Sequence, residues 1–471
     1  MSFGEREFDA PRRAGYFDDL DFFNRELEDD EDKYDDEDEY EDGEDDDEGE
    51  DDNDEGDDEY AAEDDTEANR LQMSDEGGVT AAALDNDDLL GEILLRLSPL
   101  PTSLPRASVV SKRWELLATD PDFRRRFLAH HRKPPILGVF EQRGRTLVFT
   151  SVLDPPDRIP PARFDLPDPG GLAFDSWTLP GCRHGFVLIL FQRLSLILMF
   201  DPISVDVRAL AIPPGFGPRV EFPPDYTICA CTISAAVLCD AGSGQGHVHG
   251  DCHMSPFKLA VVGTFSGGQH PAVARLYSSK TGIWRKAVWT PGPCAGTVSR
   301  LPSTLIGNAL YWWLDESEDE ILKFDMGKRR LTVVKRPNFT GIPSSCIRII
   351  RAEGGGVGMA VLSYPSFQMW GRTVSNEGVA TWMLQKTVNM HDIIGLPSGL
   401  ETSNEVIVGY SEDADVVFIS VSSNSEHYTF VVQLESMKSR KLNQNLLENS
   451  YHPFANFYTG GNCLFIFTSQ E

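Results

Sequence analysis

The stretch Leu196-Ile-Leu-Met-Phe-Asp-Pro-Ile-Ser-Val-Asp-Val-Arg-Ala-Leu210 decides the fold of most of this chain. An apolar run enters a polar Asp-Pro turn and a second run leaves it, which is the pattern of a β-hairpin. Looser copies of this strand–turn–strand unit lie at 274–284, 321–334 and 428–442. The C-terminal two thirds of the chain therefore repeat one kind of hairpin.

The spacing of the polar turns indicates how these hairpins assemble. The turns near Asp201, Ser278 and Asp325 lie 77 and then 47 residues apart, and a period of about 40–50 residues is typical of β-propeller blades. From Ile136 onward, short apolar runs alternate with Gly, Pro, Asp and Ser clusters over about 335 residues. We expect a large all-β domain, a β-propeller of five to seven blades. An irregular pair of β-sandwiches is the alternative.

The N-terminal part of the chain is strongly acidic. Of 471 residues, 75 are Asp or Glu and 42 are Lys or Arg, which gives a net charge of −33. Residues 28–60 hold 25 of these acids and a single Lys, and like charges at that density cannot offset the entropy cost of ordering. We expect residues 1–78 to be a disordered acidic tail. It could aid solubility, bind a basic partner such as histones, or act in local regulation.

Composition argues against several classes of function. Nonspecific nucleic-acid binding and adhesion to anionic membranes both need clustered Lys and Arg, and the net charge of −33 disfavours both. The N-terminus has no apolar run of a secretory signal. The most apolar stretch, 185–200, is interrupted by Gln192 and Arg193, whereas a spanning helix needs about 20 apolar residues. We interpret this stretch as two buried strands and expect a soluble protein of the nucleus and/or cytoplasm, with its cysteines mostly reduced.

Residues 84–130 have a helical pattern instead. Between positions 89 and 97, apolar residues recur at helical spacing after a run of acids that suits a helix N-terminus. A second short helix should begin at Thr102 or Ser103, where Pro105 is tolerated in the first turn. The sequence therefore predicts an α+β multidomain chain, with a small all-α domain at 79–133 and the all-β domain at 134–471.

The helical segment resembles an F-box. The match runs through 84–97, the Ser-Lys-Arg-Trp run that ends at Trp114, and the Asp-Pro-x-Phe run that ends at Phe123. Two positions depart from the family, because Asp85 stands where Pro is usual and Ser111 where Cys is common. A unit of this size buries too little apolar surface to be stable alone, as expected for half of an interface.

The resemblance implies that these helices interlock with a Skp-type adaptor of a cullin ubiquitin ligase. By resemblance, the candidate adaptor contacts are Leu84, Leu89, Ile93, Leu94, Leu97, Val109, Val110 and Trp114. The alternative for any one of these residues is that it belongs only to an internal helical core.

Residues 135–471 resemble the C-terminal region of a large plant F-box group. The shared features include the Asp201-Pro turn, the run 255–263, a Leu-Tyr-Ser-Ser run followed by Trp284, and the closing run 454–458. The resemblance implies a β-propeller-like domain that recognises a target protein. The long acidic tail is not a regular feature of that group.

Cysteines and histidines gather between positions 229 and 253. They are Cys229, Cys231, Cys239, His247, His249, Cys252 and His253. Thiolates and imidazoles can hold zinc, but the paired C-x2-C spacing is missing. The first two cysteines alternate with apolar strand residues, where Cys is an ordinary core residue. We predict that the cysteines are core thiols and that the histidines lie in a loop. No metal ligands are therefore predicted, and a metal site is the alternative.

No motif in the sequence indicates catalysis or a bound cofactor. The glycine run 354–358 precedes a strand rather than a helix, so a tight turn is expected there. The aromatic run 311–313 is read as a half-buried strand, and no phosphate loop or nucleophile elbow occurs. We therefore predict a non-enzymatic substrate-recognition subunit of a Skp–cullin–F-box ligase, with an unknown target protein. Three alternatives remain open: a scaffold that works through its acidic tail, an enzyme on a propeller scaffold, and an F-box protein without a ligase role.

Overall fold

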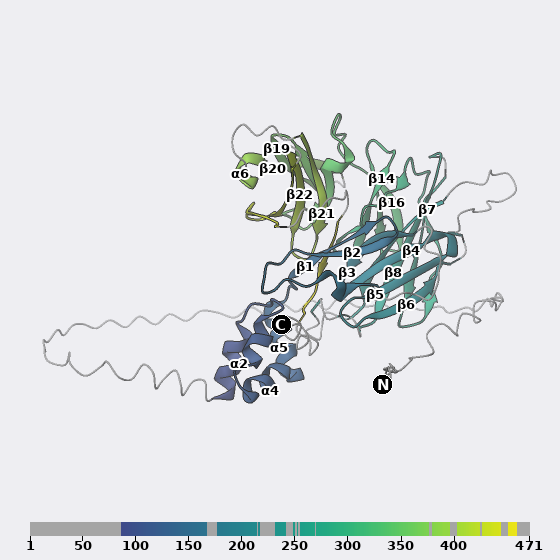
Figure 1. Ribbon diagram of the computed structural model, residues 1–471. Coiled ribbons are helices and arrows are strands. Elements are labelled where there is room, and N and C mark those ends of the chain that lie inside the picture. Colours follow the sequence, from purple (N-terminus) through teal and green to yellow (C-terminus); the bar gives the residue numbers. More distant parts are fainter. Residues whose placement is uncertain are drawn as a thin grey trace, which may run out of the picture. The chain divides into compact units, whose positions relative to one another are not determined.

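The computed structural model describes residues 86–166, 177–213, 215–216, 231–241, 248–249, 252, 255–268, 270–375, 379–395, 403–423, 426–443 and 451–458. The predicted acidic tail at 1–78 lies outside these residues, as do Leu84 and Asp85. Within them, a group of helices precedes a long series of strands (Figure 1). The predicted fold class, a small helical unit followed by a large all-β propeller, is confirmed.

The helical unit contains α2 (Asp87–Leu95), α3 (Ser103–Ser108), α4 (Lys112–Thr119) and α5 (Pro121–His131). Side chains just before three of these helices cap them, because they accept hydrogen bonds from otherwise unpaired backbone N–H groups. Asn86 accepts from the N–H of Asp88 at 2.9 Å, and Asp120 accepts from the N–H of Phe123 at 2.7 Å. The helix predicted to start at Thr102 or Ser103 begins at Ser103.

Six sheets follow, numbered here as blades. Blade 1 contains β3 (Thr178–Arg183), β4 (Phe186–Phe191), β5 (Leu196–Asp201) and β6 (Asp206–Ala211). Blade 2 contains β7 (Cys231–Cys239), β8 (Phe257–Phe265), β9 (Val273–Ser278), β10 (Ile283–Trp284) and β11 (Val288–Trp289). Blade 3 contains β12 (Thr297–Val298), β13 (Thr304–Ile306), β14 (Ala309–Asp315), β15 (Glu320–Asp325) and β16 (Arg330–Lys335).

The remaining blades complete the series. Blade 4 contains β17 (Ile347–Arg351), β18 (Val357–Ser363), β19 (Ser366–Val374) and β20 (Ala380–Asn389). Blade 5 contains β21 (Ser403–Ser411), β22 (Val416–Ser423), β23 (Glu426–Gln433) and β24 (Ser439–Lys441). Blade 6 contains β1 (Ile136–Arg143), β2 (Thr146–Ser151) and β25 (His452–Ala455). Short helices between strands are η2 (Pro161–Phe164), η3 (Gln192–Leu194), η5 (Ser344–Cys346) and α6 (Met390–Ile394).

The six sheets close into a ring. The first strand of each blade contacts the first strand of the next, from β3 through β7, β12 and β13, β17 and β21 to β25, which contacts β3 again. This cyclic order makes the domain a six-blade β-propeller, within the range that the sequence predicted. We letter the strands of each blade A to D from the innermost strand outward, so β25 is strand A and β1 is strand B of blade 6. Because neighbouring strands of a blade are antiparallel, as in blade 1, the A–B and C–D connections of every blade lie on one face. The B–C and D–A connections lie on the other, and we call these the A–B face and the B–C face.

Each blade is buried on both of its faces, which explains the continuous apolar runs. In β4, Phe186, Leu188 and Leu190 pack toward blade 2, while Val187 and Ile189 pack toward blade 6. Alternate residues of a strand point to opposite faces, so a strand between two blades needs apolar residues at every position. The stretch 185–200 forms two buried strands joined at Gln192 and Arg193, as predicted.

The sequence underestimated the burial of the aromatic run in β14. Tyr311, Trp312 and Trp313 are only 7%, 0% and 4% exposed, so the prediction of a half-buried strand is wrong. Both faces of β14 are covered, one by blade 2 and the other by blade 4. The glycine run 354–358 does form the expected turn, with Gly355 at φ 76°. None of the helices that the structure describes is long and apolar enough to span a membrane.

Two features hold the ring together. The C-terminal strand β25 pairs with the first strand β1, with Phe140 opposite His452, so the two ends of the propeller share blade 6. Near the axis, the buried Arg183 of blade 1 forms an ion pair with Glu412, which follows β21 of blade 5. Glu412 also accepts a hydrogen bond from the backbone N–H of Leu305 in blade 3 at 2.6 Å. This pair therefore joins three blades.

Candidate functional site

The helical unit presents a group of exposed large apolar side chains. They are Leu89 at 49%, Ile93 at 43%, Val109 at 75%, Val110 at 62% and Leu116 at 66% exposure. Two come from α2, two from the end of α3 and one from α4. Single exposed apolar residues are common on protein surfaces, but several on one unit of this size indicate a binding surface. We call these five residues the apolar helix surface.

The opposite sides of the same helices form a small core. Its buried members are Leu90, Leu94, Leu95, Leu104, Ala107, Ala118, Phe123 and Phe127. In α2, the core residues and the exposed residues alternate at helical spacing, so one helix serves both surfaces. The core holds the helices in place while the exposed residues stay available.

The structure separates the predicted adaptor contacts into three groups. Leu89, Ile93, Val109 and Val110 belong to the apolar helix surface. Leu94 is fully buried in the core, and Leu97 and Trp114 pack against that core as partly buried residues. Leu84 lies outside the described residues. Sequence reasoning missed Leu116, although it is on the same helix as Trp114 and its periodicity could have shown that it points away from the core.

The structure shows why serine suits position 111, one of the two positions that depart from the family pattern. Its hydroxyl accepts a hydrogen bond from the N–H of Trp114 at 3.3 Å and so caps α4. Serine is among the best capping residues, whereas a thiol accepts hydrogen bonds weakly. The substitution therefore preserves the turn that leads into α4.

Ion pairs between helices fix the angles in this unit. Arg113 Nε lies 2.7 Å from a carboxylate oxygen of Asp87, and Arg126 Nη2 lies 2.8 Å from one of Glu92. These pairs are exposed, so each contributes little to stability, about 0–1 kcal/mol. They connect α2 to α4 and to α5.

A second candidate site is a cavity of about 560 Å³ on the B–C face of the propeller. It lies between the B–C connection of blade 3, residues 315–318, and the connection from blade 3 to blade 4, residues 336–344. This volume is in the range of cavities that bind small ligands or peptide side chains. The helical unit joins the propeller through the start of β1, which is at the A–B face, so the connectivity puts the cavity on the opposite face.

The cavity combines an aromatic floor with an acidic rim. The guanidinium of Arg336 stacks on Trp313, 4.3 Å from the ring centroid, and donates to the carbonyl oxygen of Ser317 at 3.0 Å. Asp315, Glu316 and Glu318 also line the cavity. Burial raises the pKa of Asp315, and the charge of Glu316 adds to this, while a hydrogen bond from Ser299 opposes it. Glu316 and Glu318 supply exposed carboxylates to the rim, and the guanidinium of Arg336 adds one positive charge to the lining.

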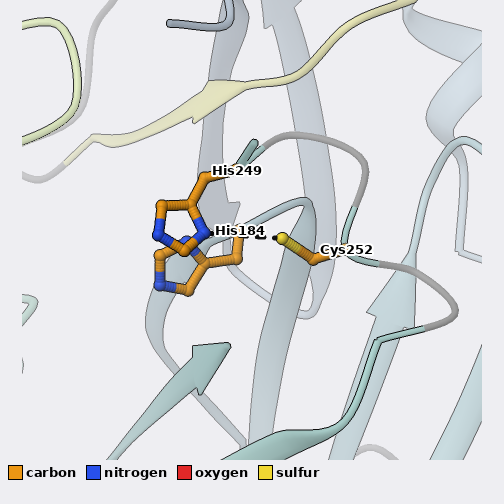
Figure 2. Close-up of side chains that lie close together, drawn as sticks. All are labelled: His184, His249 and Cys252. Carbon is orange, nitrogen blue, oxygen red and sulfur yellow. Dashed lines mark hydrogen bonds between the residues drawn. The ribbon is translucent and has the colours of Figure 1, made fainter. Parts of the chain in front are cut away.

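A third group joins part of the cysteine- and histidine-rich segment to a residue far away in sequence. The potential ligand atoms of His184, His249 and Cys252 lie within 4.8 Å of one another (Figure 2). His184 is in the β3–β4 turn of blade 1, and the other two are in the β7–β8 connection of blade 2. A hydrogen bond with Cys239 raises the pKa of His249, burial opposes this, and the charges of Asp413 and Glu412 also raise it. We call His184, Cys239, His249 and Cys252 the Cys/His corner.

Of the other members of that segment, the structure describes only Cys231, which is a core thiol as the sequence predicted. Cys231 is a buried residue of β7, and burial raises the pKa of its thiol to about 12, so it is an unreactive core thiol. Cys229, His247 and His253 lie outside the described residues. His184 was missed because 45 residues separate it from the nearest cysteine of the segment, Cys229.

Comparison with known proteins identifies both parts of the chain. The family model of the F-box domain matches residues 86–126. The model described as "F-box protein AT5G49610-like, beta-propeller" matches residues 181–456, more than half of the chain. The curated proteins contain no match.

Solved structures offer only distant likenesses. TolB from Acinetobacter baumannii is 11% identical with a TM-score of 0.34, covering 69% of this chain and 68% of that one. The dihydro-heme d1 dehydrogenase NirN in complex with DHE is 11% identical with a TM-score of 0.31, covering 70% and 77%. Likenesses this weak carry no argument about function.

Proposed function

Because the chain belongs to the family of F-box proteins with an AT5G49610-like β-propeller, we propose that it is a substrate-recognition subunit of a Skp–cullin–F-box ubiquitin ligase. The helical unit binds a Skp-type adaptor, and the propeller binds a target protein. The chain itself is not an enzyme in this proposal, since its contribution is to raise the effective concentration of the target at the ligase. The proposed location is the nucleus and/or the cytoplasm.

The apolar helix surface carries this proposal. Its five large side chains stay exposed although the same helices have a well-formed core of their own. Fully burying one such side chain contributes about 1.5–3 kcal/mol, so docking them together supplies a substantial part of the affinity of a stable complex. The proposed contacts are Leu89, Ile93, Val109, Val110 and Leu116. Leu94, Leu97 and Trp114 act indirectly, by shaping the helices.

Target recognition is assigned to the cavity on the B–C face. Its aromatic floor and acidic rim suit a peptide segment with an apolar anchor next to Lys or Arg, because opposite charges across an interface favour association. Connectivity also supports this choice, since the cavity lies on the face opposite the one through which the helical unit is attached. Target and adaptor can then bind at the same time.

Adaptor binding is tested by co-expression of the full chain with a Skp-type adaptor. Gel filtration with light scattering should give a one-to-one complex. The double variant Ile93→Asp/Val110→Asp should lose it, because a carboxylate in a desolvated interface is strongly unfavourable. Both positions are exposed, so the variant should fold normally.

The matched control is Leu194→Asp/Val205→Asp, which introduces the same charges at two exposed apolar positions of blade 1. This variant should retain the complex. Co-purification of the adaptor with the Ile93→Asp/Val110→Asp variant at the wild-type level would show that the apolar helix surface is not the binding site.

A further inference from the structure

We propose that the Cys/His corner is a site for a thiophilic divalent cation, zinc being the best fit, and that the bound ion joins the first two blades. The corner offers two imidazoles and two thiols, a ligand set that selects zinc over calcium or magnesium. Three of these groups gather within 4.8 Å although they come from two different blades. Neither the family matches nor the proposed function assigns a role to them.

The distances are close to those of a tetrahedral zinc site. With zinc–nitrogen bonds of about 2.0 Å and zinc–sulfur bonds of about 2.3 Å, neighbouring ligand atoms lie roughly 3.3–3.8 Å apart. Cys252 Sγ and His249 Nδ1 are already 3.6 Å apart. The remaining separations among His184, His249 and Cys252 reach at most 4.8 Å, about 1 Å beyond the separations of a closed tetrahedral site. Figure 2 shows the sulfur of Cys252 facing His249, with the imidazole of His184 beside that of His249.

The backbone around His184 holds one ligand in a fixed place. His184 and Gly185 both have positive φ, 53° and 85°, and form the two-residue turn between β3 and β4. A turn of this kind is rigid because the paired strands on both sides determine it. The imidazole of His184 is 6% exposed and the thiol of Cys252 2% exposed. The ring centroid of His184 lies 4.1 Å from that of His249. A buried, fixed imidazole facing a buried thiol is the core of the proposed site.

Cys239 supplies the fourth ligand in this proposal. It is the last residue of β7, and its side chain is hydrogen-bonded to His249. With Cys239 the site has two ligands of each kind, which is a composition found in closed structural zinc sites. Asp413 and Glu412 interact electrostatically with His249, although Glu412 is already paired with Arg183 and burial raises the pKa of Asp413. The bound ion would tie the long β7–β8 connection to the neighbouring hairpin.

The test uses the full chain, purified in the presence of a reductant and stripped of metal, and titrated with Co²⁺ as the probe. A site with thiolate ligands gives an intense thiolate-to-cobalt charge-transfer absorption in addition to the visible bands of tetrahedral cobalt. The acidic tract at 28–60 can also bind cations, but carboxylates do not give the charge-transfer band. We expect the band to saturate at one equivalent and to disappear when Zn²⁺ is added.

Matched cysteine variants decide whether the band comes from this corner. Cys252→Ser should weaken cobalt binding at least ~10-fold, since even residues that only support a metal ligand contribute that much, and Cys239→Ser/Cys252→Ser should abolish the charge-transfer band. Cys294→Ser is the control, because this thiol is equally buried between blades 2 and 3. It should leave the titration unchanged.

A second readout does not depend on absorption. Zn²⁺ should raise the unfolding temperature of the wild-type chain and of Cys294→Ser, since a ligand that binds only the folded state stabilises it. The shift should vanish in His249→Ala, a replacement at an exposed position that leaves the fold intact. The proposal is overturned if the wild-type chain gives no charge-transfer band, or if Cys239→Ser/Cys252→Ser retains the band at full strength.

Discussion

Leu89 and Leu94 stand five residues apart in α2, and their exposure gives them different tasks. Leu94 is fully buried in the helical core, whereas Leu89 is about half exposed. Replacing a buried Leu with Ala removes its apolar contacts and leaves a cavity, which costs about 2–5 kcal/mol. A surface replacement usually changes the free energy of unfolding by about 0.5 kcal/mol or less.

We therefore predict that Leu94→Ala destabilises the helical unit and Leu89→Ala does not. Hydrogen exchange of the α2 backbone amides measures this directly, with faster exchange expected only for Leu94→Ala. Leu89→Ala should instead weaken adaptor binding with exchange unchanged. Fast exchange in Leu89→Ala would place this side chain in the core rather than in the proposed interface.

The buried side chain of His452 indicates how a fall in pH changes the stability of the propeller. Burial in β25 lowers its pKa to about 3, whereas an unfolded histidine has a pKa near 6.5. Between these values the unfolded chain binds a proton that the folded chain does not, so stability falls as pH decreases from about 6.5 toward 3. One fully linked proton changes the free energy of unfolding by about 1.4 kcal/mol per pH unit.

The replacement His452→Leu tests this linkage. It removes the titrating group from a buried place where Nδ1 has no hydrogen-bond partner. We expect urea unfolding at pH 7 and pH 5 to show a smaller loss of stability in the variant than in the wild-type chain. The difference between the two chains isolates His452 from the carboxylates, and equal losses would mean that His452 is protonated in the folded state.

Among the structural elements, β25 has the largest influence on the closure of the ring. Phe454 is 1% exposed and its ring packs against Phe140 at 5.3 Å and Phe164 at 5.7 Å. These contacts join β25 to β1 and η2, which stand near the beginning of the propeller in the sequence. Removing them opens the ring at the point where its two chain ends meet.

Phe454→Ala should cost about 3–5 kcal/mol of propeller stability and should make the chain more sensitive to protease. Leu442→Ala is a useful comparison, because this residue is also buried but lies between blades 5 and 6 before the closing strand. We expect both variants to lose stability, with early proteolytic cleavage near the C-terminus only in Phe454→Ala. The same cleavage pattern in both would argue against a special role for β25.

At this level the repeated units that the sequence shows are the outer hairpins of the blades. The units recognised at 196–210, 274–284, 321–334 and 428–442 are the C–D hairpins of blades 1, 2, 3 and 5. Their turns are short and polar because they are exposed; in blade 1, Asp201 accepts a hydrogen bond from the N–H of Ile203 at 2.9 Å. The hairpin of blade 4 went unrecognised because its second strand, β20, has exposed apolar residues such as Met383 and Leu384 instead of a clear alternation.

The candidate sites show the same division between local and distant information. Exposure on α2 could be expected from helical periodicity, since Leu89 and Ile93 recur on one side and Leu90 and Leu94 on the other. The Cys/His corner could not be assembled from sequence, because His184 reaches it only through the packing of blade 1 against blade 2. The turns near Asp201 and Ser278 lie 77 residues apart because the connections before and after β7 are long.

For the whole molecule, the proposed function requires two separate surfaces on one chain. In the proposed function, the exposed apolar helix surface binds the adaptor and the cavity on the B–C face binds the target. Reversing two exposed charges at the rim, Glu316→Lys/Glu318→Lys, should therefore abolish target capture but leave adaptor binding intact. The control Glu353→Lys/Glu435→Lys makes the same change at exposed positions on the A–B face and should preserve both.

Mixing the variants provides the decisive measurement. Each chain is fused to a proximity-labelling enzyme, and the abundance of the labelled proteins is compared with and without proteasome inhibition. Wild-type chain and the A–B face control should lower the abundance of the same labelled set, whereas the rim variant should not label it. Ile93→Asp/Val110→Asp should label the set without lowering its abundance.

Co-expression of the rim variant with Ile93→Asp/Val110→Asp should not restore turnover, because proximity arises only when one chain holds both partners. Restored turnover would mean that two copies of this chain share the work, and unchanged labelling by the rim variant would move target recognition away from the cavity.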